Sequence, residues 1–174
     1  MVFVKIRFEK RDSFRVSGFA VETSLDSAVE DIGYLWENHE KKLLNLANGE
    51  SPLYGIMWYT ENHNYFYLLG IEDNDNSITD IINNISNING NSENSKNSEN
   101  SKNEIVSVDI PSACFGIATI PEEMDGIKAW TQYFEVELPK LAYLPDDEHG
   151  KYFESYFDGV CEFWTPVKKV DQIH

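Results

Sequence analysis

The sequence predicts an α+β fold made of two copies of a strand–helix–strand–strand unit. Two segments with apolar residues at helical spacing are each preceded by one strand-like run and followed by two. A Gly-x-Ala motif precedes each helix, at Gly18 and Gly116, and the two glycines are 98 residues apart (116 minus 18). A tryptophan lies within each helix, at Trp36 and Trp130, with a separation of 94 (130 minus 36). The matching order and offsets indicate an internal duplication.

In the first half of the chain, alternating and aromatic-rich runs predict one long helix and four strands, the last three of which form the strand–helix–strand–strand unit. The helix begins near residue 25 and stops at Asn48-Gly49, because glycine readily ends a helix. The predicted strands are residues 2–8, 14–23, 53–59 and 65–71.

In the second copy, a strand at residues 113–120 leads into a helix that opens at Pro121 and ends near Leu138, where Pro139 follows. Two further runs, residues 151–157 and 160–167, close the unit as a hairpin. A segment at 105–108 resumes strand pairing before this copy.

Asp158-Gly159 between these two runs is a strong hairpin signal, because a type I′ turn needs positive φ at both central residues. A two-residue turn also fixes the register, which sets the members of each face. One face is predicted to carry Phe153, Ser155, Phe157, Val160, Glu162 and Trp164, and the other Tyr152, Glu154, Tyr156, Cys161 and Phe163.

Glu162 is the functional lead, because a carboxylate among aromatic side chains is costly unless it meets a partner or a cationic ligand. A solvated strand face with a shielding aromatic explains the same pattern equally well. Glu154, between Tyr152 and Tyr156, is expected at the surface, since tyrosine hydroxyls suit a wet sheet face.

Between the copies, residues 73–103 are rich in Asn and Ser and contain an identical tandem hexapeptide at 91–96 and 97–102. This composition predicts a low-complexity insertion between a first half at 1–72 and a second half at 104–174 of one domain. Residues 73–77 superficially resemble a calcium loop, but Ile78 stands where that loop needs glycine, so calcium is rejected.

The chain has 174 residues and a formal net charge of −16, which repels nucleic acid and anionic lipid. No apolar run is long enough for a membrane span, and the expected location is the cytoplasm. Cys114 and Cys161 are expected as reduced, buried thiols. The four histidines are scattered and no phosphate loop occurs, so we expect no metal and no cofactor.

An ordered set of motifs resembles the GyrI-like family, the effector-binding domains of bacterial AraC-type transcription activators. It covers nearly the whole chain outside residues 73–103. The motifs are Gly18-Phe19-Ala20-Val21-Glu22-Thr23, Leu35-Trp36-Glu37, Leu53-Tyr54-Gly55-Ile56, Leu69-Gly70-Ile71, Ile110-Pro111, Trp130, Tyr152-Phe153-Glu154-Ser155-Tyr156 and Cys161-Glu162-Phe163-Trp164-Thr165-Pro166-Val167.

The resemblance implies one antiparallel sheet with both long helices on one face and a ligand cleft between the halves. It also implies a stand-alone module that binds a hydrophobic or cationic amphiphile, as in multidrug-binding regulators, with Glu162 as the counter-ion. The expected walls of the site are Trp36, Trp58, Tyr67, Phe115, Trp130, Phe153 and Trp164.

Two other functions remain open. Some relatives hydrolyse strained cyclopropanoid compounds, in which case Glu162 would position water and Tyr54 or Tyr67 would transfer a proton. A protein-interaction module of the gyrase-inhibitor type is the third possibility, with the acidic surface meeting a basic protein partner.

Overall fold

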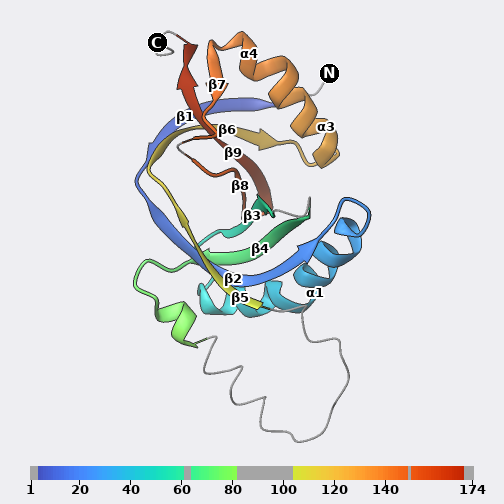
Figure 1. Cartoon of the computed structure of the whole chain (residues 1–174), viewed down its shortest axis with the longest axis vertical. Helices are drawn as coiled ribbons and strands as arrows, with labels where there is room; N and C mark the ends of the chain where they lie inside the picture. Colours follow the sequence, from blue (N-terminus) through green and yellow to red (C-terminus); the bar gives the residue numbers. More distant parts are fainter. Residues whose placement is uncertain (1–3, 61–63, 82–103, 149, 171–174) are drawn as a thin grey trace, which may run out of the picture. The chain divides into compact units, whose positions relative to one another are not determined.

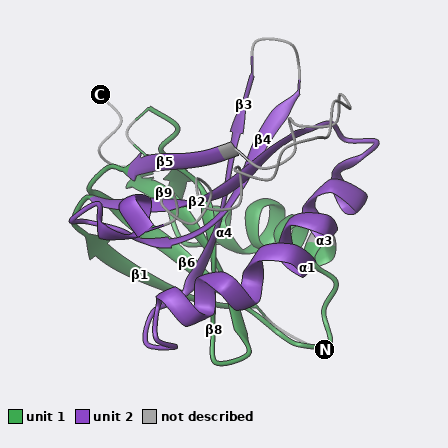
Figure 2. Ribbon diagram, turned by 90° about the horizontal axis from the view of Figure 1, so that it is seen from below, with its two compact units in different colours: residues 1–13, 110–174 green, residues 14–109 purple. Residues whose placement is uncertain are grey.

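The computed structural model describes residues 4–60, 64–81, 104–148 and 150–170 (Figure 1). It confirms the α+β class, with antiparallel strand pairs and helices packed on them. The chain divides into two compact units, residues 1–13 with 110–174 (unit 1) and residues 14–109 (unit 2), coloured separately in Figure 2. Within the described ranges, no helix has both the length and the apolar content needed to cross a bilayer.

Unit 2 is built from the first strand–helix–strand–strand copy and one later strand. Its strands lie in the order β3-β4-β2-β5, and β4 pairs antiparallel with both β2 and β3. The elements are β2 (Phe14–Thr23), α1 (Ala28–Leu46), β3 (Leu53–Tyr59), β4 (Tyr65–Glu72) and β5 (Glu104–Ile110).

Helix α1 packs against β2 and β4 through a narrow apolar stripe. Leu35, His39 and Leu43 are its buried residues, and their spacing of four places them on one side of the helix. The His39 ring stacks on Phe19 of β2, with the ring centroids 3.8 Å apart. The side of α1 that carries these three residues therefore holds the helix to the sheet.

Unit 1 is built from the second copy and the first strand of the chain. Its strands lie in the order β1-β6-β9-β8, all antiparallel, and β7 also pairs with β9. The strands are β1 (Lys5–Arg11), β6 (Ala113–Ile120), β7 (Tyr143–Pro145), β8 (Phe153–Phe157) and β9 (Val160–Lys169). One continuous helical run covers them: α3 (Gly126–Thr131), the π-helical turn η1 (Gln132–Glu137) and α4 (Leu138–Lys140).

The core of unit 1 lies between this helical run and one face of its sheet. It contains Val4, Ala118, Ala129, Tyr133, Leu138, Phe163 and Val167, with Cys161, Ile120 and Met124 packed at its edge. Tyr133 is fully buried and donates a hydrogen bond of 3.0 Å to the Gly116 carbonyl, which ties η1 to β6. Burial raises the pKa of Tyr133 to about 12, so its hydroxyl stays protonated as a donor.

Three expectations about element boundaries are corrected. The first strand runs from Lys5 to Arg11 rather than over 2–8, and residues 1–3 lie outside the described residues. The first helix begins at Ala28, not residue 25. The second helix begins at Gly126 rather than Pro121 and is interrupted by η1, where the Leu138 N–H bonds to the Tyr133 carbonyl five residues back.

The predicted hairpin is confirmed in turn and in register. Asp158 and Gly159 both have positive φ, 49° and 74°, as a type I′ turn requires. Phe153 lies opposite Trp164, and Ser155 lies opposite Glu162. The two faces of β8 and β9 are therefore those that the sequence predicts.

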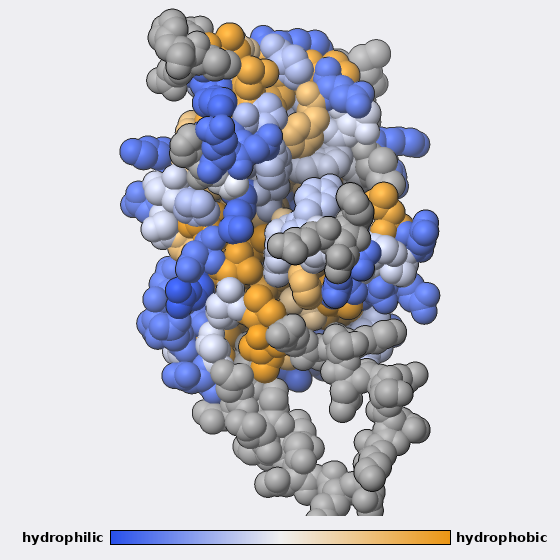
Figure 3. Space-filling view, viewed as in Figure 1, coloured by the Kyte–Doolittle hydropathy of each residue, from blue (hydrophilic) through white to orange (hydrophobic). Residues whose placement is uncertain are grey.

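Hydrophilic and hydrophobic residues are interspersed on the face drawn in Figure 3. Some large apolar side chains are strongly exposed, among them Leu25 at 89% and Val29 at 91%.

Gly18 of β2 lies opposite Gly70 of β4, and the two strands approach too closely there for a side chain. A Cβ on Gly18 would lie 2.1 Å from the Leu69 carbonyl oxygen and 2.5 Å from the Gly70 Cα. We predict that Gly18→Ala lowers the free energy of unfolding by about 3 kcal/mol, because the obstacle is backbone that cannot rotate away. Urea unfolding followed by circular dichroism measures this.

Gly33→Ala is the matched control, because nothing lies within 4 Å of a Cβ at Gly33 on exposed α1. That change should stabilise the fold by about 1 kcal/mol, the helix-propensity difference between the residues. Equal effects of the two substitutions would contradict the close β2–β4 approach.

Candidate functional site

The two glutamates of the β8–β9 hairpin lie on opposite faces of the unit 1 sheet. Glu162 shares a face with Ser155 and Trp164, while Glu154 lies opposite Phe163. Phe163 belongs to the core beneath the helical run, so Glu154 lies on the helix side and Glu162 on the other side. Each carboxylate therefore has its own surroundings.

Glu162 is already paired with a cation of its own unit. Arg7 of β1 donates two hydrogen bonds to it, Nη1 to Oε1 at 2.5 Å and Nη2 to Oε2 at 3.0 Å. Thr119 of β6 donates a third, at 3.3 Å. The bond with Glu162 raises the pKa of Arg7 above its ordinary value, as expected for a two-pronged pair of this kind. Glu162 thus has an internal counter-ion.

Aromatic side chains do gather beside this pair, as the hairpin register predicts. Trp164 stacks on Phe153 with ring centroids 5.2 Å apart, and Phe115 meets both edge-on. The indole Nε1 donates to Ser155 Oγ at 2.9 Å, and the guanidinium groups of Arg7 and Arg11 lie 5.7 and 5.4 Å from the Trp164 ring centroid. The cation–π partners of Trp164 are therefore two residues of the chain itself.

A cavity of about 260 Å³ lies on the helix side of the same sheet. Its lining comes from the ends of β6, β8 and β9 and from the segment that leads into α3. The lining residues are Ile120, Pro121, Glu122, Met124, Gly126, Glu154, Tyr156, Gly159, Cys161 and Phe163.

The chemistry of this cavity is apolar and acidic. Two of the described residues that line it are glutamates, Glu122 and Glu154, and none is basic. Tyr156 donates a hydrogen bond of 2.7 Å to Oε2 of Glu154, which fixes the orientation of the carboxylate. Such a space suits a ligand with an apolar body and a positive charge.

Cys161 contributes a thiol to the wall. Burial raises the pKa of this thiol to about 12, and the nearby Glu154 carboxylate adds to the effect. The neutral thiol is a poor nucleophile, so Cys161 acts as an apolar wall residue.

Trp130, one of the expected wall residues, lies behind the cavity rather than in it. Its ring meets Phe163 at a centroid distance of 4.6 Å and Phe134 at 4.3 Å, both edge-on. It therefore supports Phe163, which lines the cavity.

The remaining expected residues belong to unit 2. Tyr67 is buried and accepts a hydrogen bond of 3.2 Å from Trp36 Nε1. Trp58 stacks on Phe66, with ring centroids 5.3 Å apart. Tyr54 is 1% exposed, and its hydroxyl lies 3.5 Å from a Glu72 oxygen. These aromatic residues have packing partners within their own unit.

Glu154 is the residue that sequence reasoning assigned to the surface. The pattern Tyr152-x-Glu154-x-Tyr156 is typical of a solvated strand face, and the structure places Glu154 half-buried at the wall of the cavity. The available signal was Phe163, which shares this face in the predicted register and is too large and apolar for an exposed row. An aromatic cross-strand neighbour was thus a reason to consider Glu154 as well as Glu162.

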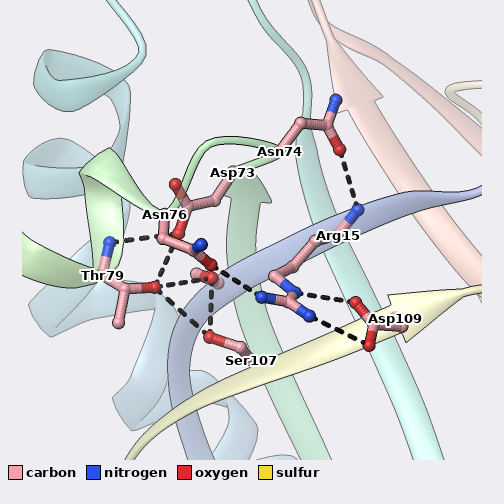
Figure 4. A network of polar contacts seen from close by, with 8 residues as sticks. Arg15, Asp73, Asn74, Asn76, Thr79, Ser107 and Asp109 are labelled. Carbon is pink, nitrogen blue, oxygen red and sulfur yellow. Dashed lines mark hydrogen bonds and ion pairs between the residues drawn. The ribbon is translucent and has the colours of Figure 1, made fainter.

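The acidic run at 73–77 forms a helix cap. Asp73 accepts hydrogen bonds from the backbone N–H groups of Ile78 and Thr79 and from Thr79 Oγ1, at the start of a helical segment at 77–81. Figure 4 shows the wider network, in which Arg15 of β2 bonds to Asn76 and forms an ion pair with Asp109 of β5. Among the described residues no three His, Cys, Asp or Glu side chains are grouped as a metal site requires.

Solved structures share this fold. SAV2435 bound to tetraphenylphosphonium matches with a TM-score of 0.58 and 14% identity, over 98% of each chain. The C-terminal domain of EcmrR matches with a TM-score of 0.53 and 14% identity, over 97% of this chain and 100% of that one. A putative bacterial transcription regulation protein from Staphylococcus aureus MU50 matches at 0.56 and 13%, over 94% and 98%.

These matches show that the chain has the fold of the GyrI-like effector-binding domains. The comparison with protein-family models and the comparison with curated proteins both give no match.

We predict that Asp73→Asn lowers the free energy of unfolding at pH 7 by about 1 to 2 kcal/mol, through loss of a charged cap. Burial alone would raise the pKa of Asp73, but hydrogen bonds from Thr79, Ile78 and Ser17 bring it below the ordinary 3.8. Because the pKa of Asp73 is lower in the folded than in the unfolded chain, ionised Asp73 stabilises the fold fully at a pH above its unfolded-state pKa. This contribution is lost as the pH falls through its folded-state pKa.

The stability difference between wild type and Asp73→Asn should therefore shrink below pH 4, as urea unfolding at pH 7 and pH 3 would measure. Asp80→Asn, an exposed change on the same helical segment, is the control and should show little difference at either pH. A constant Asp73→Asn deficit across this range would contradict the cap.

Proposed function

We propose that this protein binds a small hydrophobic cation in the cavity of unit 1, with Glu154 as the counter-ion. The observation that carries the proposal is the cavity lining, which combines apolar side chains with two carboxylates and no basic group among the described residues. A protein of the same fold is bound to tetraphenylphosphonium, a lipophilic cation, and that supports the ligand class.

The choice of Glu154 over Glu162 rests on their partners. Glu162 is held by two hydrogen bonds from Arg7, so a second cation would have to compete with a guanidinium of the same chain. Glu154 lines the cavity, which Glu162 does not, and it accepts a hydrogen bond from the Tyr156 hydroxyl that orients the carboxylate. A cation entering the cavity would therefore meet Glu154 rather than Glu162.

The size of the cavity limits the ligand. Ligand pockets commonly enclose about 300–1,000 Å³, and this one encloses about 260 Å³. It suits one aromatic ring with a quaternary nitrogen, or one arm of a larger cation. The segment at 121–125 precedes α3 and contributes Pro121, Glu122 and Met124 to the lining. The rest of a larger cation would lie next to this segment.

We predict that benzyltrimethylammonium binds and that neopentylbenzene, its neutral isostere, binds at least tenfold more weakly. The two molecules have the same shape, so the difference reports the charge of the ligand, and tenfold corresponds to about 1.4 kcal/mol. Isothermal titration calorimetry and thermal shift with both ligands and with tetraphenylphosphonium measure this, since a ligand of the native state raises the melting temperature.

Glu154→Gln should reduce the affinity for the cation at least tenfold and leave the neutral isostere unaffected. Glu162→Gln is the matched control and should change cation affinity less than twofold, because Arg7 already neutralises that carboxylate. The opposite ranking of the two variants would move the site to Glu162. Equal binding of the two isosteres by wild type would refute the counter-ion role itself.

Mass spectrometry of each mixture, with a cyclopropanoid compound added to the panel, separates binding from turnover. Recovery of intact compounds is expected of a binding protein. A hydrated ring-opened product would instead identify a hydrolase.

A further inference from the structure

Helix α1 of unit 2 and the turn before it carry an exposed apolar row. Val29 is 91% exposed, and Leu25, four residues earlier in the turn before the helix, is 89% exposed. Gly33, also exposed, continues this row at a spacing of four along the helix. Trp36 borders the row on the side of the sheet, because its Nε1 donates a hydrogen bond to Tyr67 of β4.

Gly33 is the second unusual feature of this row. Glycine in a helix interior costs stability relative to alanine, and nothing within 4 Å of a Cβ at Gly33 requires its absence. The packing of α1 on its own sheet therefore does not explain this glycine. A small residue on an exposed helix allows another helix to approach closely, because the distance between packed helix axes depends on the side chains at the contact.

Charge decides which helix would fit. Four carboxylates lie on the exposed surface of α1 and its first turn beside the apolar row: Asp26, Glu30, Glu37 and Glu40. The basic residues of α1, Lys41 and Lys42, lie at its C-terminal end. Lys42 covers Phe19 at 5.3 Å. The apolar row is thus bordered by negative charge.

We propose that this face, the row of Leu25, Val29 and Gly33 with its bordering carboxylates, docks a basic amphipathic helix of a partner protein. The apolar residues of the partner would cover Val29 and Leu25, its backbone would cross at Gly33, and its Lys or Arg residues would face the carboxylates. Nucleic acid and anionic membranes are repelled by the net charge of −16, and a second copy would oppose carboxylate to carboxylate. This proposal is independent of the cation site in unit 1.

The test uses three labelled 18-residue peptides and fluorescence anisotropy on the full chain. The first has leucine at helical spacing and lysine elsewhere, the second replaces each lysine by glutamate, and the third has the composition of the first in a scrambled order. We expect binding of the first at least tenfold tighter than of either other peptide, and at least tenfold weakening between 50 and 500 mM NaCl, because salt screens exposed charges. Equal binding of the scrambled peptide would overturn the proposal.

Variants then locate the contact. Gly33→Gln should raise the melting temperature, because glutamine is the better helix former, yet weaken peptide binding at least fivefold by obstructing the crossing point. If Gly33 mattered only for folding, Gly33→Gln would cause no loss of peptide binding. The double variant Leu25→Ser with Val29→Ser should weaken peptide binding similarly. Both side chains are strongly exposed, so a loss of binding would not be due to unfolding.

A matched pair of charge variants separates the docking face from simple net charge. Glu30→Gln with Glu37→Gln removes two carboxylates beside the row, and Glu50→Gln with Glu135→Gln removes two exposed carboxylates elsewhere. The first pair should weaken binding at least fivefold and the second less than twofold. Equal losses in the two pairs would show attraction by overall charge and would refute the docking face.

Discussion

The register of the β8–β9 hairpin is the constraint on which the site depends. Because side chains alternate between the two faces of a strand, a slip of one residue would exchange the faces of Glu154 and Glu162. Asp158 and Gly159, both at positive φ, hold the turn to two residues and exclude that slip. The turn thus decides which carboxylate meets Arg7 and which lines the cavity.

That assignment gives each carboxylate a different electrostatic role. Glu162 and Arg7 join β9 to β1 across the intervening β6, and because both side chains keep contact with solvent, the pair adds only modestly to stability. Glu154 accepts a hydrogen bond from the Tyr156 hydroxyl and lines the cavity instead. Two glutamates only eight residues apart in the sequence thus have different surroundings.

Much of the fold could be predicted from the sequence, because the relevant signals are local. Strand alternation, helical spacing and the Asp158-Gly159 turn each act over a few residues, and the bounds of β2, β3 and β6 match the prediction. The π-helical turn η1 could not be predicted in this way. Its residue Tyr133 is held by a hydrogen bond to the Gly116 carbonyl, a contact between elements that are distant in the sequence.

The site was predicted only in part, because its critical partners are distant in sequence. The pattern around Glu162 correctly indicated aromatic neighbours, but Arg7 lies 155 residues away and no local rule pairs the two. Likewise, a helix expected to start at Pro121 starts at Gly126 instead. Three residues of the segment before it, Pro121, Glu122 and Met124, line the cavity. Neither strand order nor helix start follows from periodicity alone.

The route of the chain between the two units has consequences for how the protein folds. The chain passes from unit 1 to unit 2 after Ser13 and returns after Asp109, so each unit takes its outermost strand, β1 or β5, from beyond the boundary of its own sequence repeat. Lys5 pairs with Thr119, a loop of more than a hundred residues, and such non-local closure slows folding. A ribosome-bound chain would leave β1 without its partner until the second repeat had been made. Cutting the gene between its repeats would give two fragments that each carry the other's edge strand, and only together could they supply all the strands of both units.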